Sequence, residues 1–244
     1  MKARKISLQL ATVLLLLSPL GKADNLIELD QGSYQGHTGD NLNLQITQIG
    51  ADNIIRKYQN SYGSWITGDD VSIHLEQMNE SGTDNIIELW HIEGDDNQVR
   101  WGQGLQLSNS TDTTFSFDGT EGGGHYARID IHGDNNKLSG YQTNQGSTTG
   151  HIFTSLIFSN NNDIWIKQLG NGQKEINLRT TSDGNAISLV QKGSGGEHTA
   201  NINLYGTYPT TLNLTQQSST DQSYTLTQNC ITVGGCSVSV IQGD

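Results

Sequence analysis

Histidine and carboxylate side chains are the groups in this 244-residue sequence that could bind a metal ion or move protons. The seven histidines show neither an HxxxH nor an HExxH spacing. The adjacent pairs Asp69–Asp70 and Asp95–Asp96 cannot share one face of a strand, because neighbouring residues point to opposite faces. The double glycines also miss the nine-residue frame of calcium-binding β-rolls. We therefore predict no catalytic residue, no metal site and no cofactor, and a structural role for the histidines.

Asparagine and glutamine recur in a seven-residue unit, N-x-h-x-h-x-Q, where h is apolar. Clear copies are Asn97 to Gln103, Asn162 to Gln168 and Asn185 to Gln191. Alternation with period two predicts strands with one buried face. Buried amides that stack in ladders both donate and accept hydrogen bonds, which offsets the cost of their burial. We predict an assembly role in such ladders for Gln48, Asn53, Gln59, Gln77, Asn97, Gln103, Asn136, Gln142, Asn162, Gln168, Asn185, Gln191, Gln216, Gln228 and Gln242.

The elements that position these amides are short strands separated by turns. Segments rich in Gly, Asp and Asn, such as EGDD before Asn97 and TSDG before Asn185, tolerate tight reversal of the chain. Strands of this length can close into flat coils of two strands each, about 4.8 Å apart. The predicted fold is an all-β β-solenoid of two-strand coils, with cross-β stacking on assembly.

Degenerate copies of the unit fill the gaps between the clear ones, and their register is open. Ten clearer copies, of which three are given above, and these six degenerate ones give about sixteen strands, or about eight coils. The degenerate copies are Asn85 to His91, Thr113 to Gly119, His125 to Ile131, His151 to Ile157, Lys174 to Thr180 and His198 to Leu204.

The beginning of the sequence has the pattern of an export signal. A basic start is followed by an apolar run from Ile6 to Leu17 and by the small residues Gly21 and Ala23. The run is too short for a membrane span, and no second run of spanning length follows. We predict a secretion signal over residues 1–23, an N-terminal segment over 24–41 and the repeat solenoid over 42–244. The expected destination is the cell surface or the extracellular space, reached through the periplasm.

Composition excludes several classes of protein. Removal of residues 1–23 leaves nine Lys and Arg against 25 Asp and Glu, a net charge of about −16, which argues against nucleic acid as a partner. Only 33% of residues are hydrophobic, too few for a conventional globular core. Disorder is the simplest interpretation of such a composition, but the ordered placement of the apolar residues favours the solenoid.

Cys230 and Cys236 are the only two cysteines and lie six positions apart. In an exported chain this spacing favours one disulfide across a turn. Two free thiols are the next interpretation, and a metal site would need further ligands.

The stretch LNLQITQIGADNIIRKYQ, from Leu42 to Gln59, resembles the curlin repeat, in which the frame x(5)-Q-x-G-x-x-N-x(5)-Q recurs. Gln48, Gly50, Asn53 and Gln59 occupy that frame here. The segment from Gln191 to Gln228 is similar to the C-terminal repeats of the minor, nucleating curli subunit. The resemblance covers roughly residues 42–242.

The resemblance implies a subunit of an extracellular curli-like amyloid fibre, which acts in bacterial adhesion and in the biofilm matrix. It also implies self-assembly, contacts with other curli subunits and passage through a curli-type outer-membrane secretion channel. The chain is longer than typical curlins, its repeats are less regular, and the glycine-rich secretion segment of the major subunit is absent. These departures favour a minor, nucleating or accessory subunit.

Two other functions remain open from the sequence. A monomeric β-solenoid adhesin or glycan-binding protein would use exposed aromatic residues such as Trp90 and Trp165. A β-helix enzyme that acts on acidic polysaccharide would need carboxylates clustered on one face. The last unit, CSVSVIQ, runs to within two residues of the end of the sequence, so we expect an uncapped strand edge there that can accept another strand.

Overall fold

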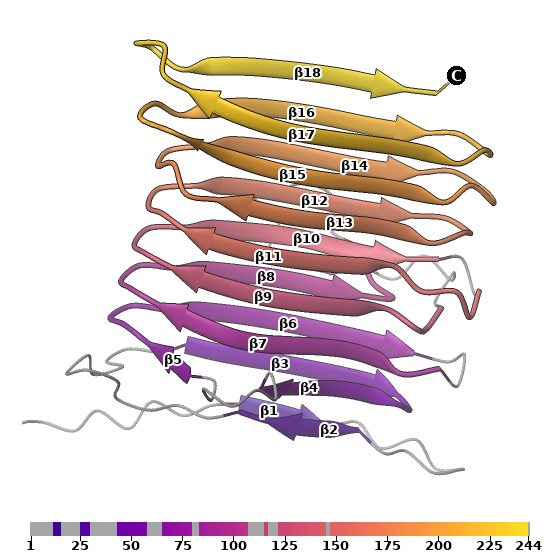
Figure 1. Ribbon diagram of the computed structural model, residues 1–244. Coiled ribbons are helices and arrows are strands. Elements are labelled where there is room, and N and C mark those ends of the chain that lie inside the picture. The colour runs from indigo at the N-terminus through magenta and orange to yellow at the C-terminus, as the bar shows by residue number, and fades with distance from the viewer. Residues whose placement is uncertain are drawn as a thin grey trace, which may run out of the picture.

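The computed structural model describes residues 12–15, 25–29, 43–57, 65–79, 83–106, 115–116, 122–144 and 147–243. In these ranges every regular element is a β-strand, and the strands stack into a β-solenoid of about 7 turns (Figure 1). This confirms the predicted fold class. Within the same ranges no helix is long and apolar enough to cross a membrane.

Two parallel sheets form the walls of the solenoid. We call the first sheet A; its strands, in spatial order, are β1 (Thr12–Leu15), β3 (Asn43–Gly50), β6 (Ser72–Asn79), β8 (Gln98–Gln103), β10 (Lys137–Thr143), β12 (Asp163–Leu169), β14 (Ala186–Lys192), β16 (Thr210–Gln217) and β18 (Cys236–Gln242). We call the second sheet B; its strands are β2 (Leu26–Glu28), β4 (Asn53–Lys57), β7 (Asn85–Glu93), β9 (Tyr126–His132), β11 (Ile152–Phe158), β13 (Lys174–Thr180), β15 (His198–Gly206) and β17 (Gln222–Cys230), with β5 (Trp65–Thr67) beside β7.

Each turn of the solenoid takes one strand from each sheet, and like positions of successive units pair. In sheet A, for example, Ile164 pairs with Leu138 on one side and with Ile187 on the other. In-register pairing follows from the repeat, because a slip by one residue would move every apolar side chain to the wrong face. The seven-residue unit therefore fixes both the strand and its partner.

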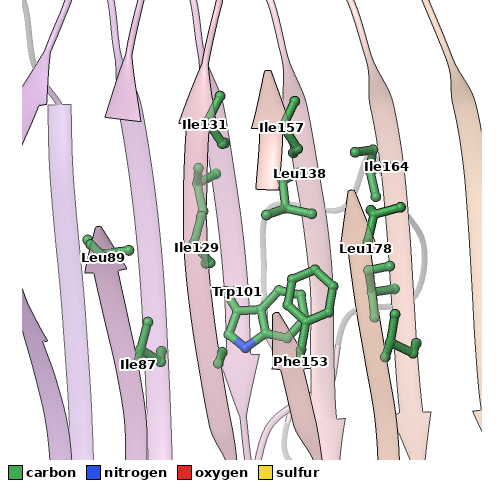
Figure 2. Close-up of a cluster of buried hydrophobic side chains, with 14 of the residues drawn as sticks. Ile87, Leu89, Trp101, Ile129, Ile131, Leu138, Phe153, Ile157, Ile164 and Leu178 are labelled. Atoms are coloured by element: carbon green, nitrogen blue, oxygen red, sulfur yellow. The ribbon is translucent and has the colours of Figure 1, made fainter. Parts of the chain in front are cut away.

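The core is a thin layer of side chains between the two sheets. Alternate residues of each strand point into it, as in β12, where Ile164 and Ile166 are fully buried. Trp101 is the largest fully buried side chain and stacks on Phe153, with ring centroids 4.5 Å apart (Figure 2). Gly140 is the register partner of Trp101 in the next strand. Glycine is needed there because a Cβ atom would lie 2.7 Å from the indole ring. The glycine that weakens this repeat unit thus makes room for the indole.

The turns are hydrogen-bonded to one another along the stack. The residue before the first inward asparagine adopts a positive φ near 57°, as at Asn135 (φ 57) and Asn161 (φ 58), a conformation that Asn and Asp tolerate. The carboxylate Oδ1 of Asp134 accepts the backbone N–H of Asp95 at 2.9 Å, and Asn160 does the same for Asp134 at 2.7 Å. The acidic turns therefore satisfy their neighbours' backbone groups.

The described residues of one degenerate unit do not join the stack, and three of the described strands fall outside the predicted units. Of the unit Thr113 to Gly119, the structure describes Phe115 and Ser116, and Ser116 forms an isolated antiparallel bridge with Gln106. Phe115 packs on the outside of sheet A with Leu105 and Tyr141, so the described part of this unit lies outside the two-sheet stack. The unpredicted strands are β1, β2 and β5. β1 lies within the predicted signal, most of which is outside the described residues, as is most of the predicted segment 24–41.

Candidate functional site

A continuous column of glutamines runs along the corner where each strand of sheet A ends. In every step, the side-chain Nε2 donates to the Oε1 of the glutamine in the next coil, at 2.8 to 3.0 Å. This glutamine column comprises Gln48, Gln77, Gln103, Gln142, Gln168, Gln191, Gln216 and Gln242.

The same amides also join sheet A to sheet B. The Nε2 of Gln142 donates to the carbonyl oxygens of His151, at 3.0 Å, and Tyr126, at 3.1 Å, where strands of sheet B begin. Gln191 makes the equivalent contacts to His198 and Glu175. Both side chains are fully buried. Each inner glutamine therefore satisfies backbone carbonyls that the turn of the coil would otherwise leave without donors.

The glutamine column has a direction, and its two ends are unlike. At the first end the Oε1 of Gln48 is buried and has no hydrogen-bond partner among the described residues. At the other end Gln242 accepts from Gln216 and gives one N–H to the carbonyl of Ser223. Its second N–H meets no further glutamine in the described part of the chain. One end thus has a spare acceptor, and the other has a spare donor.

A column of asparagines occupies the opposite corner, where strands of sheet A begin. The Oδ1 of Asn136 accepts both the backbone N–H and the side-chain Nδ2 of Asn162, at 3.1 and 2.8 Å. Asn162 accepts the same two groups from Asn185, and Asn97 accepts the backbone N–H of Asn136. The column continues to Thr210, whose backbone N–H binds Asn185. Four of the predicted ladder asparagines therefore lie together.

A third column, at the start of the sheet B strands, contains residue types that the ladder prediction left out. It begins with Asn53 and Asn85 and continues with His125, His151, Lys174 and His198, all fully buried. The Nδ1 of His151 accepts the backbone N–H of Lys174 at 3.2 Å, while its Nε2 lies 2.9 Å from the carbonyl of Thr143. Asn85 makes the same kinds of contact through its side-chain oxygen and nitrogen. An imidazole here takes the place of an amide.

These contacts require neutral imidazoles. Burial lowers the pKa of His151 to about 3, and burial together with the neighbouring His151 lowers the pKa of His125 well below its usual value. Burial also lowers the pKa of Lys174 to about 8, and its Nζ donates to the carbonyls of Asn171, Gly172 and Gly196. The signal for this column was present in the sequence, because His and Lys begin four degenerate units at the position of Asn.

Three predicted ladder residues are not in the glutamine or asparagine column. Asn53 lies in the third column, and its backbone N–H donates to the side chain of Asn25. Gln228 lies in β17 of sheet B, where its register partner is Leu204. It is therefore outside the glutamine column and has no glutamine or asparagine as its described register partner. Gln59 lies outside the described residues.

The predicted cysteine pair is joined in the structure. A disulfide links Cys230, at the end of β17, to Cys236, at the start of β18, with the Cα atoms 5.7 Å apart. It closes the turn that carries the chain into the last strand. The final coil is thereby attached covalently to the one before it.

The C-terminal end of the stack leaves its core uncovered. In the described residues β18 and β17 are the last strands of sheets A and B, and neither has a neighbour on its outer edge. The inward side chains Leu226, Val238 and Val240 are only partly buried, whereas their counterpart Leu214 is 1% exposed. Two edges of unpaired backbone groups therefore flank an incomplete apolar layer.

Fold and site together define a parallel β-solenoid held by internal amide columns, with unlike ends. The sequence matches no family model, no curated protein and no solved structure.

Proposed function

We propose that this chain is a fibre subunit that adds copies of itself head to tail, with the C-terminal end of one copy on the N-terminal end of the next. The observation that carries the proposal is the polarity of the glutamine column. The spare N–H of Gln242 and the spare Oε1 of Gln48 are the two halves of the hydrogen bond that joins every other pair in the column. A second copy in register would complete it.

The open edges supply the rest of the interface. Addition of a copy pairs the free edges of β17 and β18 and covers Val238, Val240 and Leu226. Backbone pairing gives affinity, while the amide column and the apolar layer select the register. Such head-to-tail contacts do not close on themselves, so they generate a filament.

The N-terminal edge is covered by β1, in which Leu15 pairs with Gln48. β1 lies in the predicted secretion signal, so removal of that signal on export would uncover the edge of β3, and copies could then add outside the cell. This would keep the chain from polymerising before it leaves the cytoplasm.

The resemblance of Leu42 to Gln59 and of Gln191 to Gln228 to curlin repeats supports the biological setting of this proposal. We propose a minor, nucleating or accessory subunit of curli-like amyloid fibres in bacterial adhesion and biofilm matrix. Its partners would be further copies, other curli subunits and a curli-type secretion channel. The disulfide is compatible with this setting, because disulfides form and persist in oxidising compartments outside the cytoplasm.

Seeded elongation with paired variants tests the proposal. Val240→Lys places an ammonium on the inner face of the open strand, whereas Ser239→Lys adds the same charge to the outward face of the same strand. We expect the wild-type chain and S239K to elongate seeds in a thioflavin-T assay, with diffraction spacings near about 4.7 and about 10 Å. V240K should not elongate. Equal elongation of the two variants, or a wild-type chain that stays monomeric with seeds, would overturn the proposal.

A monomeric adhesin or glycan-binding protein is the second candidate, favoured by a groove on the outer face of sheet B. The groove has a volume of about 340 Å³ and is lined by Arg128, Asn177, Arg179, Asn201 and neighbouring residues. Amide and guanidinium groups are suited to sugar hydroxyls and carboxylates. This function predicts a stable monomer with saturable glycan binding that Asn177→Ala weakens.

A further inference from the structure

A β-bulge in β7 creates an unusual cluster on the outer face of sheet B. Leu89 pairs with Ile129 and Ile92 with Ile131, so β7 has one residue more than β9 over the same interval. After the extra residue the alternation changes, and Ile92 is fully buried while Glu93 is on the outside. Bulges often lie beside functional sites because they redirect side chains in this way.

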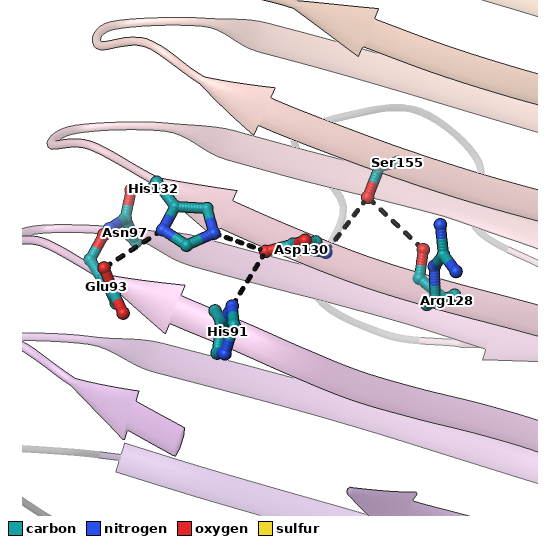
Figure 3. Close-up of polar contacts among 7 residues, drawn as sticks. All are labelled: His91, Glu93, Asn97, Arg128, Asp130, His132 and Ser155. Atoms are coloured by element: carbon teal, nitrogen blue, oxygen red, sulfur yellow. Dashed lines mark hydrogen bonds and ion pairs between the residues drawn. The ribbon is translucent and has the colours of Figure 1, made fainter. Parts of the chain in front are cut away.

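The redirected side chains meet two residues of β9. The Oε2 of Glu93 is 3.0 Å from the Nδ1 of His132, its register partner (Figure 3). The other ring nitrogen of His132, Nε2, is 2.8 Å from the Oδ1 of Asp130, and the same oxygen is 3.8 Å from the Nδ1 of His91. Asp130 is 1% exposed, so a buried carboxylate faces two imidazoles.

We propose that His91, Glu93 and His132 form a binding site for a divalent transition-metal ion, with Zn²⁺ as the probe. One ligand atom from each residue lies within 4.8 Å of the other two. Two imidazoles and one carboxylate form a ligand set of the kind that holds zinc in open sites. The side chains of Glu93 and His132 are 29% and 26% exposed, so a fourth position faces solvent.

Asp130 positions the ligands and does not itself coordinate the ion. A histidine that binds a metal through one ring nitrogen usually donates its other N–H to a carboxylate, which fixes the tautomer and the orientation of the ring. The contact of Asp130 with the Nε2 of His132 has this form and leaves Nδ1 directed at Glu93 and the ion. Asp130 therefore acts on His132; its Oδ1 is 3.8 Å from the Nδ1 of His91, which is too far for a hydrogen bond.

The surroundings favour a cation and hold the rings in place. The carboxylates of Asp130 and Glu93 lie 2.8 and 3.0 Å from the two ring nitrogens of His132, so two negative charges flank the proposed site. Phe158 stacks on His132 with centroids 4.7 Å apart, and Trp90 lies 5.0 Å from His91. A bound ion would cross-link β7 to β9, and with them two successive coils.

Isothermal titration of the purified chain with ZnCl₂ tests the site. We expect one ion per chain for the wild type, and weakening of binding by about tenfold or more in His132→Ala and in the nearly isosteric Glu93→Gln. Asp130→Asn should weaken binding while one ion per chain remains. His74→Ala is the matched control, because His74 also pairs with a glutamate, Glu76, at 2.7 Å but lies on sheet A. It should bind zinc as the wild type does.

Two results would overturn the inference. The first is a wild-type chain that does not bind zinc at micromolar concentrations. The second is H132A and E93Q binding as tightly as H74A, because the ion would then lie elsewhere on the surface. Circular dichroism checks that each variant is folded. If H132A does not fold, E93Q still tests the site.

Discussion

At the scale of single residues, the fold depends on amides that are buried because they are fully hydrogen-bonded. Gln142 illustrates this, since its Nε2 binds the next glutamine and two carbonyls of sheet B while its Oε1 accepts from Gln103. Removal of one member leaves a donor and an acceptor buried without partners, which is more costly than the loss of the bonds themselves.

We therefore expect Gln142→Ala to lower the free energy of unfolding by about 2 to 4 kcal/mol. Gln98→Ala is the control, because Gln98 lies at the outward first position of β8 and its replacement should change stability by about 0.5 kcal/mol or less. Urea unfolding of the monomeric chain measures both. Equal effects of the two variants would show that the column adds nothing to stability.

The buried histidines make stability depend on pH. The folded-state pKa of His151 is about 3, below the usual value of 6.5, so its contribution is fully present above pH 6.5 and is lost as the pH falls toward 3. In that window the free energy of unfolding falls by about 1.4 kcal/mol for each pH unit. Protonation would place an N–H against the backbone N–H of Lys174.

His151→Asn should reduce this acid sensitivity, because Asn85 shows that an amide can make both contacts in the same column. We expect the slope of unfolding free energy against pH to be smaller than in the wild type by about 1.4 kcal/mol per unit between pH 6 and 4. At pH 8 the two chains should agree within about 1 kcal/mol. Identical slopes would mean that His151 is not held neutral.

At the scale of elements, the strands of the core were largely predictable. The predicted unit Asn162 to Gln168 corresponds to β12, and even the degenerate unit Lys174 to Thr180 coincides with β13. The reason is that the period-two pattern and the turn residues specify each strand locally. In-register stacking then follows, because adjacent copies present like residues.

The remaining features depend on which strands become neighbours. The unit Asn85 to His91 has the right pattern, but the bulge in β7 moves His91 out of the ladder and toward Asp130, 39 residues from His91. Gln228 has the right type but lies on sheet B. Which strands become neighbours depends on the loops between them, and the local period-two pattern of a strand does not predict its neighbours.

The disulfide acts on one element. It closes a loop of few residues, so its removal should lower the free energy of unfolding by only about 2 kcal/mol. We expect the last coil to be the part that is destabilised. In the double variant Cys230→Ser, Cys236→Ser we expect faster hydrogen exchange in β17 and β18, with β10 and β12 unchanged. Mass spectrometry of exchanged peptides measures this. Uniform loss of protection would show that the bond supports the whole stack.

At the scale of the molecule, net charge would oppose the proposed head-to-tail association. The chain without residues 1–23 carries a net charge of about −16, so copies repel one another at low ionic strength. Salt shortens the screening distance from about 30 Å at 0.01 M to about 8 Å at 0.15 M.

We expect seeded elongation to be several-fold faster at 0.15 M than at 0.01 M NaCl. Sucrose at equal osmolarity is the control and should not reproduce the acceleration, because it does not screen charge. Thioflavin-T traces at fixed seed mass measure the rates. A rate independent of salt would mean that repulsion does not limit addition.

The pairing of Trp101 with Gly140 also restricts how copies can combine. The coils are not interchangeable, since the indole of Trp101 needs the space left by Gly140 in the next coil, and the equivalent position in the coil after that carries a branched side chain, Ile166. A coil borrowed from another copy, or shifted by one turn, would place the indole against such a side chain. The stack therefore resists exchange of segments between molecules, and in the proposed head-to-tail assembly growth would be confined to the two ends.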